Sequence, residues 1–244
     1  MVEQVAHGLG SIPSKPDPKD FVLASAPGYA NAGTVFPPSF TLPGGITPAL
    51  DQDGTPECTA FATVGVKSYQ EHLQTGTWKY GKASADTLYA ECKAVDGLPA
   101  GTPGTYPRVA LQIAQTKGVR AIDGHRYLIG PYYSLLAGGD LLTNIKQSLV
   151  YYKRPVLIAL HWWAHWWSVS ALANYVLNNP AGSLMVGDHE IWVYGYVDQN
   201  GKTLLRMEQS WSDVWGNRGR CYLPFDYASA PNSGLSDAWV TIDR

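Results

Sequence analysis

The sequence predicts an α+β fold of two lobes, in which a helical lobe is followed by an antiparallel, β-barrel-like lobe with a cleft between them. Two observations favour this class. Apolar residues recur at helical spacing from residue 58 to about residue 153, whereas short apolar or alternating runs separated by turn residues follow to the end of the chain. Helices that precede antiparallel strands along a chain are typical of α+β proteins.

The helical part is expected to hold four helices. The first starts near Cys58 after Thr55-Pro56, a pair that suits a helix start, and its apolar positions continue to Leu73. The segments "SADTLYAECKAV", with Ser84 as a possible cap, "TYPRVALQIAQTKG", closed by Gly118, and "DLLTNIKQSLVYYK" supply the others.

The part after residue 154 is expected to hold strands. "PVLIALHWW" is a short apolar strand, and "HEIWVYGYVD" turns through "QNGK" and returns as "TLLRMEQSW". The Asn-Gly pair between these flanking runs indicates a hairpin. "GRCYLPF" and "AWVTID" are further candidates.

Three regions follow from these patterns. Residues 1–45 are rich in proline and glycine and are interpreted as an N-terminal arm or a short prosegment-like extension. Residues 46–135 form the helical lobe and residues 136–244 the β-rich lobe, together one domain. Residues 1–35 could lie over the cleft as a short lid.

Composition excludes several classes of protein. The 244 residues carry 18 basic and 20 acidic side chains, so no basic surface for nucleic acid is expected. No apolar run approaches the roughly 20 residues of a membrane span, and the N-terminus lacks the features of a signal peptide. We therefore expect a cytoplasmic protein or one delivered by a non-classical route, for example with a virion. Three widely spaced cysteines indicate neither a disulfide framework nor a zinc motif.

Cys58 at a predicted helix start is the candidate nucleophile. The positive end of the helix dipole favours a thiolate, which is the reactive form of cysteine. His189 heads one predicted strand and Gln209 ends its hairpin partner, so pairing could bring a base and a carboxamide together. Gln52, on the approach to Cys58, could donate to an oxyanion.

These motifs together resemble the papain-like cysteine peptidases, of the diverged kind seen in bacteria and bacteriophages. "DQDGTPECTAF" is similar to the family's Gln-to-Cys helix start, "HEIWVYGYV" to its histidine strand, and "EQSWSDVWGNRGRCYLP" to its Asn-Ser-Trp-Gly segment. The resemblance runs from about Phe36 to the C-terminus. It implies a papain-like two-lobe fold and a cysteine endopeptidase that needs no metal or organic cofactor.

The resemblance also implies a role for each matched residue. Cys58 would be the nucleophile, His189 its thiolate–imidazolium partner, Gln52 an oxyanion donor and Trp211 a shield of the imidazole–carboxamide contact. Gln209 stands where the family has asparagine; the amide can do the same work only if the longer side chain is accommodated, so reduced activity is expected.

Two acidic residues flank the motifs. Glu57, beside the cysteine, is expected to raise the pKa of the thiol, and Asp188 precedes His189 at the cleft. Substrate-binding or shielding roles are expected for both.

The stretch "HWWAHWW", His161 to Trp167, lacks the glutamate of a helical zinc motif. As a continued strand it would present an aromatic wall, which packs in the core or stacks on peptide or sugar.

Two other functions stay open on the sequence. One is a binding or structural module that keeps the fold with a weakened site. The other is a hydrolase of a peptidoglycan amide that uses the same residues. A peptide or protein substrate is the main expectation, and peptidoglycan the alternative.

Overall fold

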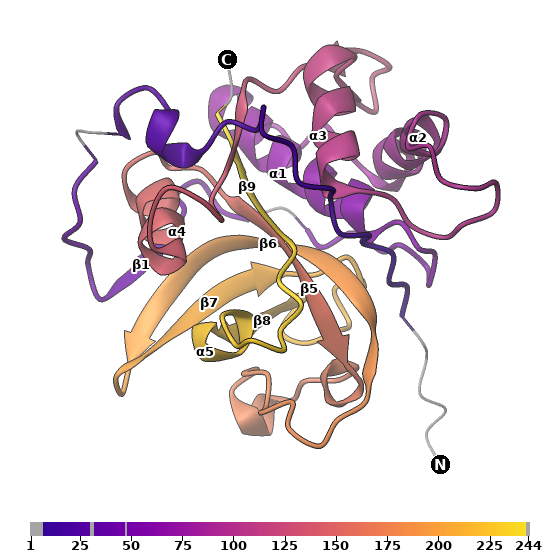
Figure 1. The fold of residues 1–244 in the computed structure, drawn as a ribbon. Helices are drawn as coiled ribbons and strands as arrows, with labels where there is room; N and C mark the ends of the chain where they lie inside the picture. The colour runs from indigo at the N-terminus through magenta and orange to yellow at the C-terminus, as the bar shows by residue number, and fades with distance from the viewer. Residues whose placement is uncertain (1–6, 30–31, 47, 243–244) are drawn as a thin grey trace.

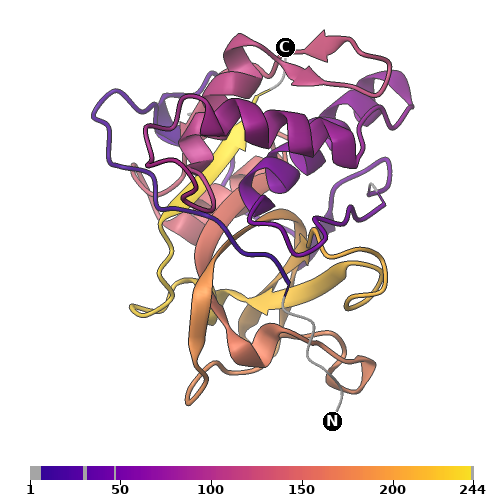
Figure 2. The ribbon, with the colours of Figure 1, turned by 90° about the vertical axis from the view of Figure 1, so that its right-hand side faces the viewer.

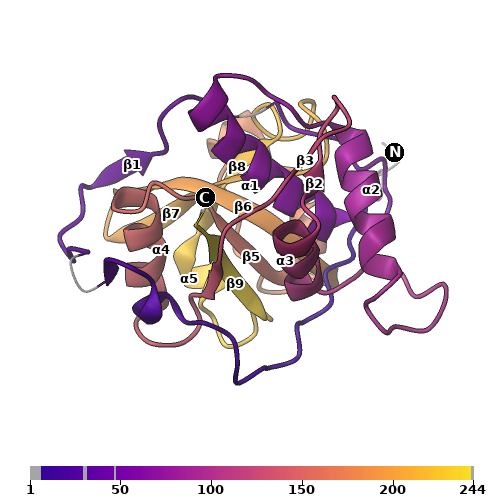
Figure 3. The ribbon, with the colours of Figure 1, turned by 90° about the horizontal axis from the view of Figure 1, so that it is seen from above.

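The structure is a computed structural model that describes residues 7–29, 32–46 and 48–242. Helices gather at one end of the molecule and long twisted strands fill the other, as Figure 1 shows. The helices are α1 (Cys58–Thr75), α2 (Lys82–Lys93), α3 (Pro107–Thr116), α4 (Leu141–Val150) and the short α5 (Phe225–Ala228). From above, α1 lies between α2 and α3 on one side and α4 on the other (Figure 3). Among the described residues, no helix has both the length and the apolar character that a bilayer crossing needs.

A seven-stranded antiparallel sheet forms the second lobe. Its path runs β4 (Tyr132–Ser134), β9 (Asp237–Thr241), β5 (Val156–Trp163), β6 (Met185–Gln199), β7 (Lys202–Glu208), β8 (Arg220–Pro224), and β1 (Ser39–Thr41) pairs with β6. In the described residues this path does not return to its first strand. The antiparallel sheet is therefore confirmed, but it is open and not a closed barrel. A separate hairpin joins β2 (Val119–Arg120) to β3 (Arg126–Tyr127).

The predicted elements all form, with small shifts at their ends. Asp140 caps α4, since its carboxylate accepts from Thr143 N at 2.8 Å. Ser84 is not the cap of α2, because the helix begins at Lys82 and Ser84 lies in its first turn. Its hydroxyl instead accepts from the backbone N–H of Gly81 at 3.4 Å.

The aromatic stretch from His161 to Trp167 departs from its prediction. Strand β5 ends at Trp163, and a short 3-10 helix (Ala164–Trp166) follows. The turn brings Trp166 back onto Trp162, with ring centroids 5.1 Å apart, and both side chains are fully buried. The prediction of a strand that continues to Trp167 was therefore wrong, whereas Trp162 and Trp166 do pack in the core.

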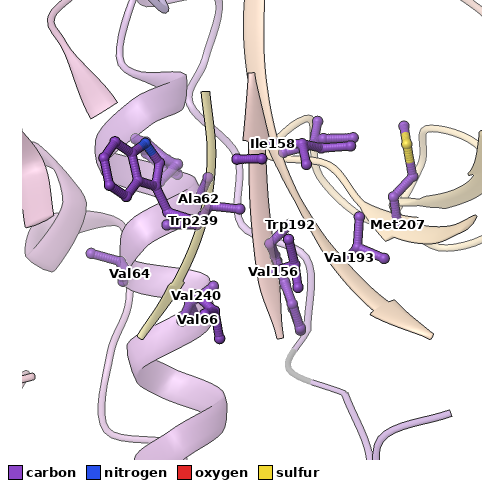
Figure 4. Close-up of a cluster of buried hydrophobic side chains, with 14 of the residues drawn as sticks. Ala62, Val64, Val66, Val156, Ile158, Trp192, Val193, Met207, Trp239 and Val240 are labelled. Carbon is purple, nitrogen blue, oxygen red and sulfur yellow. The ribbon is translucent and has the colours of Figure 1, made fainter. Parts of the chain in front are cut away.

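The core lies where α1 meets the sheet. Figure 4 shows Ala62 and Val66 on the side of α1 that faces the strands, with Val66 beside Val240 of β9 and with Val156 and Ile158 of β5 beyond, whereas Val64 points to the other side of the helix. Helix and sheet come close together at Gly65. A Cβ atom there would lie 2.7 Å from Trp192 Nε1, so the residue must be glycine for α1 to sit this close to β6. The same contact sets the position of Cys58 relative to the strands.

Gly65→Ala is therefore expected to lower the free energy of unfolding by roughly 1–3 kcal/mol, the usual cost of overpacking a close contact. Urea unfolding followed by tryptophan fluorescence measures it. Gly81→Ala is the control, because a Cβ there has its nearest neighbour at 3.8 Å. Equal stability of Gly65→Ala and the control would contradict the close contact.

The N-terminal segment crosses between the two lobes. In Figure 2 it passes in front of the gap between the helices above and the strands below. Residues 7–12, called the strap from here on, make backbone hydrogen bonds to both sides. The predicted N-terminal arm includes residues 1–6 and 30–31, which lie outside the described residues.

Candidate active site

Cys58 is the first residue of α1, as predicted, and its side chain is fully buried. The irregular loop before it is tied to the opposite lobe, since Gln52 N donates to Ser210 O at 2.9 Å. The helix start therefore points its free N–H groups, and the positive end of its dipole, into the space between the lobes.

The β6–β7 hairpin brings His189 and Gln209 together. His189 Nε2 lies 2.5 Å from Gln209 Oε1, and both side chains are buried. Gln209 lies just past the end of β7, where its N–H donates to Gly219 O at 2.8 Å. A carboxamide oxygen can only accept, so Nε2 carries the proton and Nδ1 is left as the basic nitrogen.

Trp211 stacks on the His189 ring. The centroids lie 4.7 Å apart with planes 23° from parallel, and Trp162 meets the ring edge-on at 5.1 Å. The two indoles exclude water from the His189–Gln209 contact.

Gln52 is held rigidly beside the helix start. Its Nε2 donates to Thr55 O at 2.5 Å, and its Oε1 accepts from the hydroxyl of Ser210. Ser210 was not among the residues predicted for the site. Its place directly after Gln209 in the motif was the available signal.

The strap fills the cleft between these walls. Gly10 N and Ser11 N donate to Asp188 O at 3.1 and 3.2 Å on one wall, and Gly10 O accepts from Thr105 N at 3.0 Å on the other. The Gly8 carbonyl accepts from Trp211 Nε1 at 3.2 Å, and the His7 ring stacks on Trp211 at 4.5 Å. A stretch of the chain itself thus occupies the groove beside Cys58 and His189.

Comparison with solved structures identifies the architecture. A cysteine protease, xylellain, from Xylella fastidiosa superposes with a TM-score of 0.78 at 17% identity, over 98% of this chain and 97% of that one. ProCathepsin B S9 from Trypanosoma congolense gives 0.73 at 16% identity, over 97% and 87%. Procathepsin L 3 of Tenebrio molitor larval midgut gives 0.65 at 18%, over 98% and 76%. The fold is papain-like. A scan against models of protein families and a search of curated proteins found no match.

Within this papain-like fold the thiol and the imidazole are both neutral when the strap is in place. Burial raises the pKa of Cys58 to about 12, against a partial offset from a hydrogen bond to the Glu190 backbone. Burial lowers the pKa of His189 to about 3, although its bond to Gln209 acts in the opposite direction. His189 Nδ1 is also buried and has no hydrogen-bond partner in the described part of the chain. Both shifts come mainly from burial, and they favour the neutral thiol and the neutral imidazole over the charged pair.

Asp188 and Glu57 lie at the cleft, with contacts the sequence did not specify. The Asp188 carboxylate is 2.5 Å from His161 Nδ1, while its backbone carbonyl holds the strap. Glu57 precedes α1 without capping it, and burial and then the neighbouring Asp86 raise the pKa of its carboxyl. Glu57 is not among the groups that shift the thiol of Cys58.

Glu190 is the carboxyl that lies near Cys58. It is 1% exposed, and neither of its oxygens has a hydrogen-bond partner in the described residues. Burial, and then the charge of Asp237, raise its pKa well above the ordinary value of 4.5. The direction of Glu190 could be predicted from the sequence, because successive residues of a strand face opposite sides and residue 190 therefore faces away from His189, toward α1. A carboxyl in that position has to stay protonated.

Glu190→Gln is therefore expected to stabilise the protein, increasingly as the pH rises from 5 to 8. The folded state keeps a proton on Glu190 that the unfolded state releases above pH 4.5. The free energy of unfolding of the wild type therefore falls by up to about 1.4 kcal/mol for each pH unit above that value. The neutral amide removes this loss. Thermal unfolding at pH 4, 6 and 8 measures it. A gain in Tm that does not depend on pH would contradict a protonated Glu190.

Proposed function

We propose that the protein is a cysteine peptidase in which Cys58 is the nucleophile, His189 the general base and acid, Gln209 the residue that orients the ring, and Gln52 an oxyanion donor. The observation that carries the proposal is the hydrogen bond of 2.5 Å between His189 Nε2 and Gln209 Oε1, across the cleft from the helix that begins at Cys58. The papain-like fold and the structural similarity to cysteine proteases support it.

The reaction would proceed in two steps. His189 Nδ1 takes the thiol proton of Cys58, and the sulfur attacks the carbonyl carbon of a peptide bond. Amide N–H groups at the start of α1 and of Gln52 stabilise the oxyanion. The C–N bond then breaks, the amine leaves with the proton from His189, and a thioester remains. Water, deprotonated by His189, releases the acid and restores the thiol.

The strap and the neutral groups beneath it make this a latent form of the enzyme. When the strap leaves, water reaches Cys58 and His189, and the desolvation that opposes their charged forms decreases. The thiol pKa falls, the imidazole pKa rises, and the ion pair becomes accessible. A bacterial or bacteriophage source stays a prediction.

A binding module without catalysis is the second candidate. The full burial of Cys58 and the absence of a bond to His189 Nδ1 from the described residues favour it. Under this function, Cys58→Ala would leave ligand binding and biological activity intact.

Alkylation tests the first proposal. In a variant whose strap is displaced, such as Gly8→Val, Cys58 should react with iodoacetamide near neutral pH at least about tenfold faster than a free thiol, as a thiolate of lowered pKa does. Cys92 and Cys221 are buried and serve as internal controls in the same sample, read by peptide mass spectrometry. Hydrolysis of fluorescent casein and of purified cell wall, measured side by side, assigns the substrate class. Equal labelling of the three cysteines in the folded variant would remove the case for an activated nucleophile.

A further inference from the structure

Glu190 is a buried acid that the proposed reaction does not use. Its side chain is almost completely buried, and neither carboxyl oxygen has a hydrogen-bond partner among the residues that the structure describes. It lines a cavity of about 10 Å³ together with Phe61 and Gly65 of α1, and this volume is at the lower limit for one water molecule. An ionised carboxylate at this position would therefore lack a hydration shell.

The surroundings of Glu190 do not supply a positive charge for it. Ala159 of β5 pairs with Glu190 on one side and with Asp237 of β9 on the other, so the two carboxyls flank one small side chain on the same face of the sheet. Glu208 of β7 lines the same cavity, and Arg220 donates to its Oε2 at 2.9 and 2.8 Å. In the described part of the chain, the other polar or titratable groups near Glu190 are Cys58, Thr59 and Cys92.

Cys58 shares this environment. Its sulfur accepts a hydrogen bond from the Glu190 backbone at the first turn of α1, and both side chains are buried. Burial is the largest cause that raises the pKa of the Cys58 thiol, and a negative charge on Glu190 raises it further. Two like charges that lie close together in a buried site disfavour each other, so a carboxylate on Glu190 opposes a thiolate on Cys58.

We propose that Cys58 ionises only while Glu190 holds its proton, and that this carboxyl therefore sets an upper pH limit for the nucleophile. The proposal rests on the proposed function and adds a control of the same site. At neutral pH the strap-free form holds a thiolate on Cys58, an imidazolium on His189 and a proton on Glu190. When Glu190 loses its proton to the solvent, a negative charge lies beside the sulfur. The proton on His189 Nδ1 then returns to the sulfur, which leaves a neutral thiol, a neutral imidazole and one carboxylate.

Alkylation of Cys58 between about pH 5 and pH 10 tests the proposal. The full chain with its strap displaced by Gly8→Val is compared with the same chain that also carries Glu190→Gln, by reaction with iodoacetamide and peptide mass spectrometry. With Glu190 present, the rate should reach a maximum and then fall by roughly tenfold as the pH rises, the size of effect that one neighbouring charge produces. With the neutral amide the rate should stay at its maximum. Cys221 is the internal reference, because burial alone raises the pKa of its thiol.

Glu208→Gln in the Gly8→Val chain is the matched control. Glu208 is also a buried carboxyl, but it is paired with Arg220, and it is not among the described groups that shift the pKa of the Cys58 thiol. This variant should keep the fall in rate at high pH. A fall that disappears in Glu208→Gln as it does in Glu190→Gln overturns the proposal, because the effect would not be specific to Glu190.

The outcomes separate this proposal from the proposed function. If Cys58 reacts in both chains only near the pKa of a free thiol, the peptidase is overturned. The control by Glu190 then requires the reaction to begin at a lower pH in Glu190→Gln, and an equal onset overturns it as well. Identical pH profiles of the two chains overturn the control by Glu190 even where Cys58 is activated. Glu190→Met, which is also neutral and similar in volume, replaces Glu190→Gln if circular dichroism shows that variant unfolded.

Discussion

Replacing Gly8 with valine is expected to raise the rate of Cys58 alkylation about 10- to 100-fold over the wild type. The valine side chain would overlap Thr55 O and Gln52 Nε2. An overlap of this kind destabilises the strap-bound state by roughly 1–3 kcal/mol. Each 1.4 kcal/mol of this destabilisation raises the fraction of molecules with a displaced strap tenfold. Reaction with iodoacetamide at pH 7, followed at Cys58 by mass spectrometry, measures the rate.

Pro13→Ala is the matched control for this variant. Pro13 follows the strap directly and is exposed, so its loss removes no contact with Thr55 or Gln52. The control should react at the wild-type rate. If Gly8→Val is also as slow as the wild type while it remains folded, the strap does not limit access to Cys58.

Gln209→Leu, made in the Gly8→Val background, is expected to lower kcat/KM by about 100-fold, the usual effect of a misplaced reacting group. The change removes the acceptor of the His189 Nε2 proton, so the ring loses its fixed orientation and tautomer. The buried N–H then lacks a partner, which costs a further 1–3 kcal/mol or so of stability. Gln209→Asn should also lose activity, because the shorter amide starts from a backbone position set by the Gly219 contact. Hydrolysis of a fluorogenic peptide measures both variants.

Gln70→Leu is the control for the loss of a buried amide. Gln70 is fully buried, and its Nε2 donates to Thr241 O at 2.9 Å, between α1 and β9 of the sheet. This variant should lose stability but keep its kcat/KM below the unfolding transition. Equal loss of activity in Gln70→Leu and Gln209→Leu would show that the effect of Gln209 is structural only.

Local patterns in the sequence predicted the fold well. The apolar period of "CTAFATVGVKSYQEHL" and the Asn-Gly turn between two alternating runs specify α1 and the β6–β7 hairpin without long-range information. The hairpin pairs Glu208, the last residue of β7, with Trp192, three residues after His189 in β6, so the approach of Gln209 to His189 could also be predicted. The open edge of the sheet could not be predicted, because closure of a sheet depends on pairing between strands that lie far apart in the sequence.

Contacts between distant segments were not predictable in the same way. Nothing in "HGLGSI" marks residues 7–12 as ligands of a cleft whose walls are formed by Thr55, Thr105 and Asp188. The pKa values of Cys58 and His189 also depend on contacts between distant segments. Burial is the largest cause of the raised pKa of the Cys58 thiol. Burial of this kind is a property of the packed chain and leaves no local pattern.

The strap is part of the same polypeptide as the groove that it fills, and this has a consequence for competing ligands. A short flexible tether gives a bound segment an effective concentration on the order of millimolar. A free peptide of equal intrinsic affinity must exceed that concentration to take its place, so inhibitors added in trans will show weak apparent affinity. Dilution, by the same reasoning, leaves the occupied form intact, whereas it would release an inhibitor supplied by a separate chain.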